Sequence, residues 1–337
     1  MEILKVVFVI IGTLIGAGFA SGQEIYTFFF SFGIKGLFGI VVSSILIGIT
    51  IYKTLKIIEK NNIQNYKEFL ECLIKNKKIK EIINIIVNIF ILASFYIMIA
   101  GFGAYLQQEF NLNSIIGSAI LAILCLFIFK TSIKGLVKAN EILIPLLIFI
   151  VIFIGIINLK NIDFKNINNY LIQDNNKSWL ATSILYASYN SILLMPVLTS
   201  IKEYISKTKN TKYISLIVTV ITIILLSTVF LFLINVDVNI KNLEMPAVYA
   251  INKICPNIKS IYGIIILISI FTTAISLGIS FLKDVSKNEK QYNIIAILIC
   301  ITGIIFSKMG FSNLVNLFYP ILGILGLIQI IKIIFIT

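Results

Sequence analysis

The sequence predicts an all-α integral membrane protein with ten transmembrane helices, two of which are broken within the membrane. Hydrophobic residues make up 58% of the 337 positions and charged residues only 13%, with a mean hydropathy of +1.01. Apolar runs long enough to cross about 30 Å of hydrocarbon recur along the whole chain. The first run also contains four glycines and a carboxylate where a membrane helix should be continuous. Together these observations exclude an ordinary soluble domain.

The ten predicted spans follow one another with short polar connections. We expect the first span to remain in the protein, because it is too long, and too polar at its end, for a cleaved signal peptide. The spans cover residues 3–30 (broken), 33–57, 80–107, 113–130, 134–159, 177–204 (broken), 211–236, 259–284, 291–308 and 311–335.

The formal net charge is +13, and the chain contains neither arginine nor histidine. The lysines gather at the ends of the spans and not on one soluble face, so no nucleic-acid partner is expected. With the N-terminus inside, 20 of the 28 lysines fall in cytoplasmic segments. This distribution follows the positive-inside rule and predicts a multi-pass protein with both termini in the cytoplasm. The scattered cysteines predict neither a disulfide framework nor a metal site; they are Cys72, Cys125, Cys255 and Cys300.

Residues 1–337 are expected to form a single transmembrane domain with an internal repeat. Residues 1–158 and 177–337 each hold five spans, and a polar, asparagine-rich stretch at 161–177 joins them. Five is an odd number, so the two halves must have opposite orientations in the membrane. The sequence therefore predicts a 5+5 inverted repeat.

Corresponding features of the two halves support this repeat. The first span of each half is interrupted, by Gly16 to Gly18 in the first span and by Ser188 to Ser191 in the sixth. A lysine-bearing segment precedes the third span of each half, at 61–80 and at 242–259. Interruptions at matching positions are the best pointer in a sequence to a binding site.

The break in the first span has two interpretations. Glycines allow the carbonyls of 12–15 and the amides of 16–20 to turn inward, and a half-helix starting near Ala20 would direct its positive end at a carboxylate. Alternatively, the pairs Gly12 with Gly16 and Gly18 with Gly22 form a small-residue packing face. Packing alone does not require a second break in the sixth span, which favours a binding site.

The eighth span carries a stripe of hydroxyl groups. Thr272, Thr273 and Ser276 lie within about 60° of Ser269 around a helix with 100° per residue. Two of these hydroxyls and three backbone carbonyls would make a five-oxygen cage for a hard monovalent cation. The alternative is that the hydroxyls bond to their own helix and serve packing.

The ten-span inverted repeat with broken first and sixth spans resembles the LeuT fold of the amino acid, polyamine and organocation carriers over nearly the whole chain. Two stretches are similar to the YkvI-like family of bacterial membrane proteins. They are Gly-Thr-Leu-Ile-Gly-Ala-Gly-Phe-Ala-Ser-Gly-Gln-Glu at 12–24, and Ser-Tyr-Asn-Ser at 188–191 with Met-Pro-Val-Leu at 195–198. The resemblance implies a carrier in the bacterial plasma membrane.

The resemblance also implies a sodium site. Sodium-coupled members of the fold hold the ion with two carbonyls of the first span, one carbonyl of the eighth span and two adjacent hydroxyls. The matching positions in this chain are Gly12, Ile15, Ser269, Thr272 and Thr273. Sodium is therefore the expected coupling ion, and no other cofactor is expected. A second sodium site of such carriers needs an asparagine where this chain has Phe19, which weakens the expectation of that site.

Candidate substrate-binding residues lie at the two breaks. They are Gly16, Ala17, Gly18, Phe19, Glu24, Tyr189 and Asn190. Glu24 is expected about 10 Å outward of the first break, as a partner for a substrate ammonium, as a proton carrier, or as a solvated residue of the vestibule. Lys138 is the alternative coupling residue of proton-coupled relatives, although its place at the end of an apolar run also suits an interfacial lysine. Tyr96 and Tyr105 of the third span are further candidates for the pocket wall, with core packing as the alternative.

These features predict a secondary active transporter of a small organic solute, an amino acid or related zwitterion, by sodium-coupled alternating access. One alternative is a proton-coupled transporter that uses Glu24 or Lys138. Another is a non-transporting solute receptor that resembles the subunits of spore germinant receptors. No constellation of nucleophile, base and metal points to an enzyme. The expected partners are the small-molecule substrate and the lipid bilayer.

Overall fold

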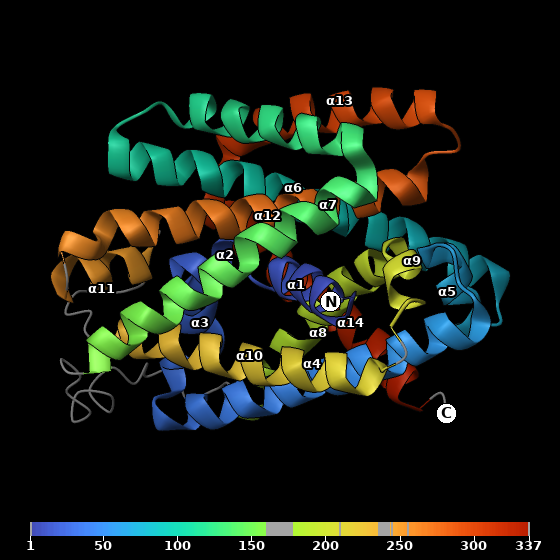
Figure 1. Ribbon diagram of the computed structural model, residues 1–337, viewed down its shortest axis with the longest axis horizontal. Coiled ribbons are helices and arrows are strands. Elements are labelled where there is room, and N and C mark those ends of the chain that lie inside the picture. Colours follow the sequence, from blue (N-terminus) through green and yellow to red (C-terminus); the bar gives the residue numbers. More distant parts are fainter. Residues whose placement is uncertain are drawn as a thin grey trace.

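The computed structural model describes residues 2–159, 178–208, 210–234, 243, 245–254 and 256–335. Within these residues every regular element is a helix (Figure 1). The long helices are α4 (Ile34–Asn61), α6 (Lys77–Phe110), α7 (Ser114–Asn158), α8 (Trp179–Ser200), α10 (Thr211–Leu233), α12 (Lys259–Val285), α13 (Glu289–Phe306) and α14 (Phe311–Phe335). The shorter helices are α1 (Glu2–Leu14), α2 (Ala17–Ser21), α3 (Gln23–Phe28), α5 (Tyr66–Leu73), α9 (Lys202–Ile205) and α11 (Pro246–Ile254), with 3-10 turns η1 (Phe30–Phe32), η5 (Pro256–Ile258) and η6 (Ser307–Met309).

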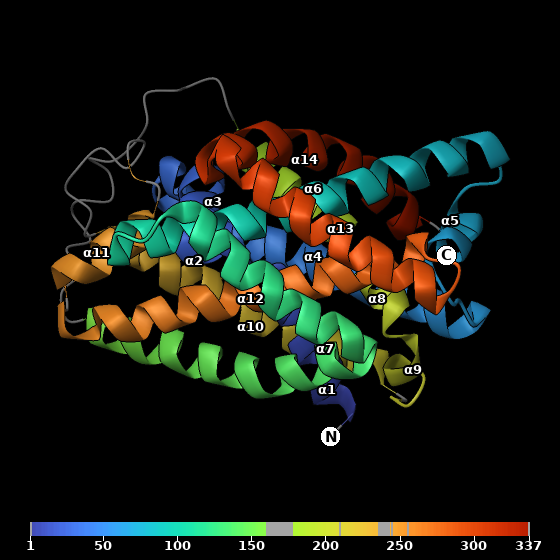
Figure 2. The ribbon, with the colours of Figure 1, turned by 90° about the horizontal axis from the view of Figure 1, so that it is seen from above.

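The predicted count of ten spans agrees with the helices of the structure. Within the described part of the chain, eight helices are long and apolar enough to cross a membrane. One of them, α7, bends sharply at Ser132, where φ is 51° and ψ is −136°, and its two halves run in different directions (Figures 1 and 2). The halves of α7 therefore supply the fourth and fifth spans. The first span is the broken series α1 to α3.

Asparagine side chains cap the start of four of these helices. Asn65, Asn76, Asn113 and Asn288 each accept hydrogen bonds from backbone amides in the first turn of the following helix. Asparagine is among the best N-cap residues, because its side chain satisfies amides that lack a partner within the helix. The asparagine-rich connections thus fix where the spans start.

The two halves of the repeat place their short surface helices at opposite ends of the bundle. Helix α5 lies at one end and α11 at the other (Figures 1 and 2). They correspond to the predicted segments 61–80 and 242–259, although residue 242 lies outside the described residues, as do the linker 161–177 and Cys255. Opposite placement of equivalent elements is what an inverted repeat requires.

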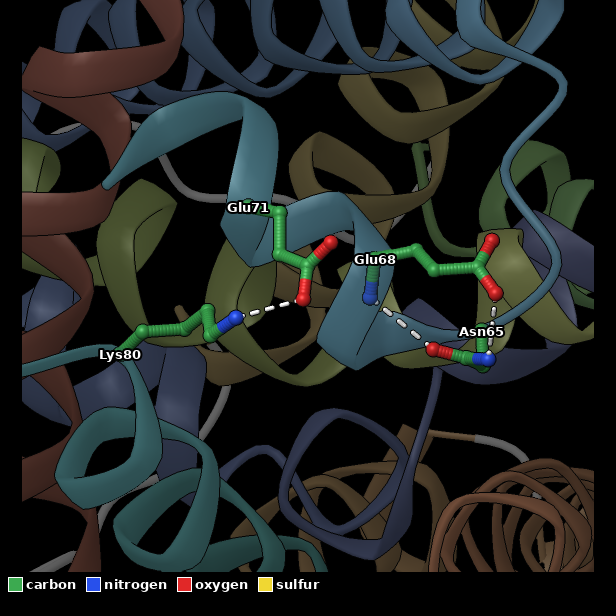
Figure 3. Close-up of polar contacts among 4 residues, drawn as sticks. All are labelled: Asn65, Glu68, Glu71 and Lys80. Carbon is green, nitrogen blue, oxygen red and sulfur yellow. Dashed lines mark hydrogen bonds and ion pairs between the residues drawn. The ribbon is translucent and has the colours of Figure 1, made fainter. Parts of the chain in front are cut away.

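Helix α5 is tied to the start of α6 by an ion pair. The Lys80 ammonium lies 2.5 Å from a Glu71 carboxylate oxygen (Figure 3). This hydrogen bond lowers the pKa of the Glu71 carboxyl. At the other end of α5, Glu68 and Asn65 form reciprocal hydrogen bonds of 2.9 Å that close the first turn (Figure 3).

Helices α8 and α12 occupy the centre of the bundle. In the most apolar 18-residue stretch of each of these two helices, 78% is buried, compared with 28% in α7 and in α13. The outer helices direct many isoleucines and phenylalanines outward, as a lipid-facing surface requires. Functional groups on α8 and α12 are therefore shielded from lipid by other helices.

The predicted interruption of the sixth span is wrong. Helix α8 is continuous from Trp179 to Ser200 and passes through the segment 188–191 without a break. The Ser188 hydroxyl donates to the Ile184 carbonyl at 2.7 Å, and the Asn190 amide donates to the Tyr186 carbonyl at 3.0 Å. Such bonds to the preceding turn allow small polar residues to remain helical.

Close packing of α14 on α8 leads to a stability prediction. A Cβ atom added to Gly326 would lie 2.1 Å from the backbone oxygen of Ser188. The backbone of a buried helix cannot move aside cheaply, so Gly326→Ala should lower the free energy of unfolding by about 1–3 kcal/mol. Thermal unfolding in detergent would measure this loss. Gly323→Ala on the same helix is the control, because its Cβ would come no closer than 3.3 Å to a neighbour, the end of the flexible Leu185 side chain. Equal midpoints for the two variants would contradict the packing.

Candidate functional site

The first span is broken where the glycines predict it. Helix α1 ends at Leu14, and Gly16 is the N-cap of α2, with extended backbone angles. The second segment thus begins at Ala17, three residues before the expected start near Ala20. A second change of direction occurs at Gly22, whose φ of 84° favours glycine and separates α2 from α3.

The broken end of α1 faces a hydroxyl group of α12. The Thr273 hydroxyl lies 2.8 Å from the carbonyl oxygen of Gly12 and 3.0 Å from that of Ile15, and it donates to this pair. Carbonyls in the last turn of a helix lack an intrahelical partner. The structure therefore brings together three of the five oxygen atoms that the sequence assigns to a sodium site.

The other hydroxyls of the stripe bond within α12. Thr272 contacts the Ile268 carbonyl at 2.9 Å and the Ser269 carbonyl at 3.2 Å. Ser269 and Ser276 donate to the carbonyls four residues before them. All four side chains of the stripe are buried. The packing interpretation thus holds for three of these hydroxyls, whereas Thr273 reaches out of its helix to the break.

The amides that follow the break have few partners. The Ala17 amide donates to the sulfur of Met98 at 3.4 Å, and sulfur is a weak acceptor. Among the described residues, no backbone hydrogen bond is formed by the amides of Gly16, Gly18 or Phe19. On one side of the break, therefore, the carbonyls are bound by the Thr273 hydroxyl, and on the other side, within the described residues, lie amides without backbone partners.

Glu24 of α3 lies against this break. An added Cβ on Gly18 would meet the Glu24 carboxylate at 2.1 Å, so the side chain folds back over the glycine. The Tyr189 hydroxyl of α8 donates to the carboxylate, and Tyr319 of α14 makes a second side-chain hydrogen bond with it. Glu24 is only 3% exposed and forms no ion pair within the described part of the chain. The expected distance of about 10 Å from the break is therefore wrong, because it assumed a straight helix.

Aromatic rings enclose the carboxylate. The Tyr189 ring stacks on that of Tyr319 with centroids 4.9 Å apart and on Phe28 at 5.6 Å. Tyr186 meets Tyr189 edge to face at 5.3 Å. Of these residues the sequence pointed only to Tyr189. Phe28, Tyr186 and Tyr319 lie in apolar runs with no local pattern that distinguishes them from core residues.

The other candidates form no hydrogen bond with Glu24 within the described residues. Asn190 bonds to its own helix, and Phe19 is packed in the core at 2% exposure. Lys138 is exposed, so the structure does not direct it to the break. Tyr96 bonds to Thr302 of α13 at 2.6 Å. Of these candidates, Asn190 reaches the Glu24 cluster through a side-chain hydrogen bond with Tyr186.

Asn140 is a residue that the sequence analysis missed. It lies on α7 two positions after Lys138, is fully buried, and its Oδ1 atom has no hydrogen-bond partner within the described residues. A Cβ added to Gly12 would meet this oxygen at 1.9 Å. Asn140, and not Lys138, therefore lies beside the break in the first span. An asparagine within an otherwise apolar span was the available signal.

Comparisons with known proteins agree with this architecture. No family model matches the chain. It is 28% identical to the membrane protein YkvI of Bacillus subtilis over 328 residues, which are 96% of this chain and 92% of that protein. It is also 28% identical to YyaD of the same organism over 331 residues, 96% of this chain and 94% of that protein.

Three solved structures share the fold at low sequence identity. A Na⁺-coupled sialic acid symporter in a substrate-bound, outward-open state is 14% identical, with a TM-score of 0.68 over 99% of this chain and 79% of that one. MhsT in complex with L-phenylalanine is 19% identical, with a TM-score of 0.68 over 97% and 87%. A nucleobase-cation-symport-1 family transporter is 11% identical, with a TM-score of 0.66 over 94% and 74%. This chain is therefore a multi-pass membrane protein with a LeuT-like inverted repeat.

Proposed function

We propose that this protein is a secondary transporter of the bacterial plasma membrane that moves a small zwitterion, such as an amino acid, together with sodium. Both termini would lie in the cytoplasm, at the end of the bundle that carries α5 and α9. The observation that carries this proposal is the contact of the Thr273 hydroxyl with the carbonyls of Gly12 and Ile15.

Sodium fits the chemistry of this contact. Carbonyl and hydroxyl oxygens are the ligands that hard monovalent cations prefer, and the site contains no formal charge that would demand a divalent ion. The described residues contain no group of three or more histidine, cysteine or acidic side chains that could hold a metal ion. A bound sodium ion would take the place of the hydrogen bond that now links Thr273 of α12 to the carbonyls of α1. The hydroxyl would turn so that its oxygen faces the ion, and the Ser269 carbonyl and the Thr272 hydroxyl would be the other ligands.

A zwitterion fits the other side of the break. The free amides around Gly16 and Gly18 suit a carboxylate, and the Glu24 carboxylate suits an ammonium group. Glu24 and its tyrosine partners are buried, so a solute reaches them only after the contact between α3 and α8 opens. Binding on both sides of one hinge would couple the ion to the solute, because each would stabilise the same closed arrangement of α1, α2 and α12.

Proton coupling through Glu24 is the second candidate. The partners of the buried Glu24 carboxyl are tyrosines and not cations. Its charge can therefore be neutralised by a bound proton as well as by a substrate ammonium. The structure offers less support for Lys138, which is exposed. A non-transporting receptor would use the same binding groups without solute turnover.

The proposal is tested first by thermal unfolding of the purified protein. The panel consists of amino acids and small organic ions in sodium and in choline buffer at two pH values. We expect one class of zwitterion to raise the unfolding midpoint in sodium but not in choline. Uptake of that solute into proteoliposomes along a sodium gradient would then distinguish a transporter from a receptor. Stabilisation that ignores sodium and follows pH would refute sodium coupling and favour the proton mechanism.

A further inference from the structure

A basic cleft lies at the bend of α7. This bend is toward the same end of the bundle as α5 (Figure 1). Its volume is about 420 Å³. It is formed where the bend of α7 meets the end of α12 and the start of α13. Its lining residues include Lys130, Ser132, Lys283, Ser286, Lys287, Glu289 and Tyr292.

The charge of the cleft is unbalanced. Three lysines line it, against one carboxylate, Glu289. Within the described residues none of these lysines forms an ion pair: Lys283 donates to the Ser200 carbonyl at 3.3 Å, and Lys130 lies 6.0 Å above the ring of Phe127. Three ammonium groups around one cavity repel one another unless an anion lies between them.

Hydroxyl groups add unused hydrogen-bonding capacity. The Ser286 hydroxyl is buried and has no partner in the described part of the chain. The Tyr292 hydroxyl faces Ser132 but makes no full hydrogen bond there. A buried hydroxyl without a partner is costly, so these groups favour a ligand with several acceptor oxygens.

The surroundings of the cleft are those of a membrane interface. Phe127 precedes the cleft on α7 and Ile294 follows it on α13, and both are exposed large apolar residues. Farther along α13, Ile297 and Leu298 continue this exposed apolar surface. A ligand held by the lysines could therefore lay acyl chains along α7 and α13.

We propose that this cleft binds a phosphate-bearing anion, with the headgroup of an anionic phospholipid as the source that the adjoining apolar surface favours. Lysine is a common phosphate ligand, and basic pockets on the cytoplasmic side of membrane proteins bind anionic headgroups. The volume admits a phosphate with a glycerol substituent, since one water occupies about 30 Å³. This site is independent of the proposed transport function.

The ligand would also reach the central helices. Lys283 lines this cleft and a second cavity of about 220 Å³ between α5, α8 and α12. Its hydrogen bond to Ser200 is at the last residue of α8. An anion in the cleft would compete with the Ser200 carbonyl for the Lys283 ammonium and so act on the end of a central helix.

The test compares unfolding midpoints in neutral maltoside micelles. Phosphatidylglycerol, phosphatidylcholine and inorganic phosphate are added to the wild type and to Lys130→Gln/Lys287→Gln. The control is Lys77→Gln/Lys78→Gln, which removes the same charge from exposed positions at the start of α6. We expect phosphatidylglycerol, and not phosphatidylcholine, to raise the midpoint of the wild type and the control, and the cleft variant to lose at least half of this shift. A response to inorganic phosphate as well would identify phosphate itself as sufficient.

An equal response of the cleft variant and the control would overturn the proposal, because it would show a general charge effect. If the double variant does not unfold cooperatively, Tyr292→Phe takes its place in the same measurement. It removes one cleft hydroxyl and leaves every charge in place. We expect it to reduce the phosphatidylglycerol shift. An unchanged shift in Tyr292→Phe together with a noncooperative double variant would also refute the site.

Discussion

Thr273→Val is expected to shift the sodium-dependent stabilisation of this protein to about 10- to 150-fold higher sodium concentrations than the wild type requires. Valine has nearly the shape of threonine, so the packing of α12 on α1 should persist, but the hydroxyl between the carbonyls of Gly12 and Ile15 is lost. The loss of a hydrogen-bonding partner to a charged group costs about 1.5–3 kcal/mol, or about 10- to 150-fold in affinity. The measurement is the unfolding midpoint as a function of sodium concentration, with choline replacing sodium.

Ser276→Ala is the matched control for this prediction. Ser276 lies on the same stripe and is equally buried, but its hydroxyl bonds to the Thr272 carbonyl within α12. Its removal should leave the sodium response intact. Thr272→Ala should weaken the response, because Thr272 is a proposed ligand even though its present partners are in its own helix. An unshifted sodium response in Thr273→Val would exclude this site.

The position of Thr273 was predictable because it depends on local periodicity. Residues 269, 272, 273 and 276 share a helix face in any regular helix, and glycines at 12, 16, 18 and 22 mark the one apolar run that is hard to keep continuous. The local pattern of apolar runs also separated the fourth and fifth spans between 130 and 134, where α7 bends at Ser132. It failed for the sixth span, because serine and asparagine can either interrupt a helix or bond to its preceding turn.

The Glu24 cluster could not be derived in this way. The Glu24 side chain lies against Gly18 because the left-handed backbone at Gly22 ends α2 and starts α3 in a new direction. A straight helix would not bring the two residues together. Tyr319 is more than a hundred residues from Tyr189, and only the packing of α14 on α8 brings their rings together. Asn140 likewise reaches Gly12 through the contact of two spans. Contacts between distant helices leave no periodic signal in either segment.

Glu24→Gln is expected to cause the largest loss of solute binding. Glutamine keeps the size of the side chain and can accept a hydrogen bond from Tyr189, so the fold should survive. It cannot balance a substrate ammonium in a buried site, and the affinity for a zwitterion should fall by about 10- to 150-fold. Equilibrium binding of the solute identified in the thermal panel measures this change. The control is Glu109→Gln, because the Glu109 carboxylate pairs with Lys259 of α12 at 2.7 Å and not with the tyrosines around Glu24.

The same variant separates the two roles of the carboxylate. If Glu24 binds the ammonium of the solute, Glu24→Gln should lose affinity at every pH at which the wild type binds. If Glu24 carries the coupling proton, the neutral glutamine mimics the protonated state, so solute binding should persist while the dependence of uptake on a pH gradient disappears. Tyr189→Phe adds a further distinction, because it removes a donor to the carboxylate without changing charge. A substrate role predicts only a modest loss in Tyr189→Phe, since the carboxylate itself still faces the ammonium.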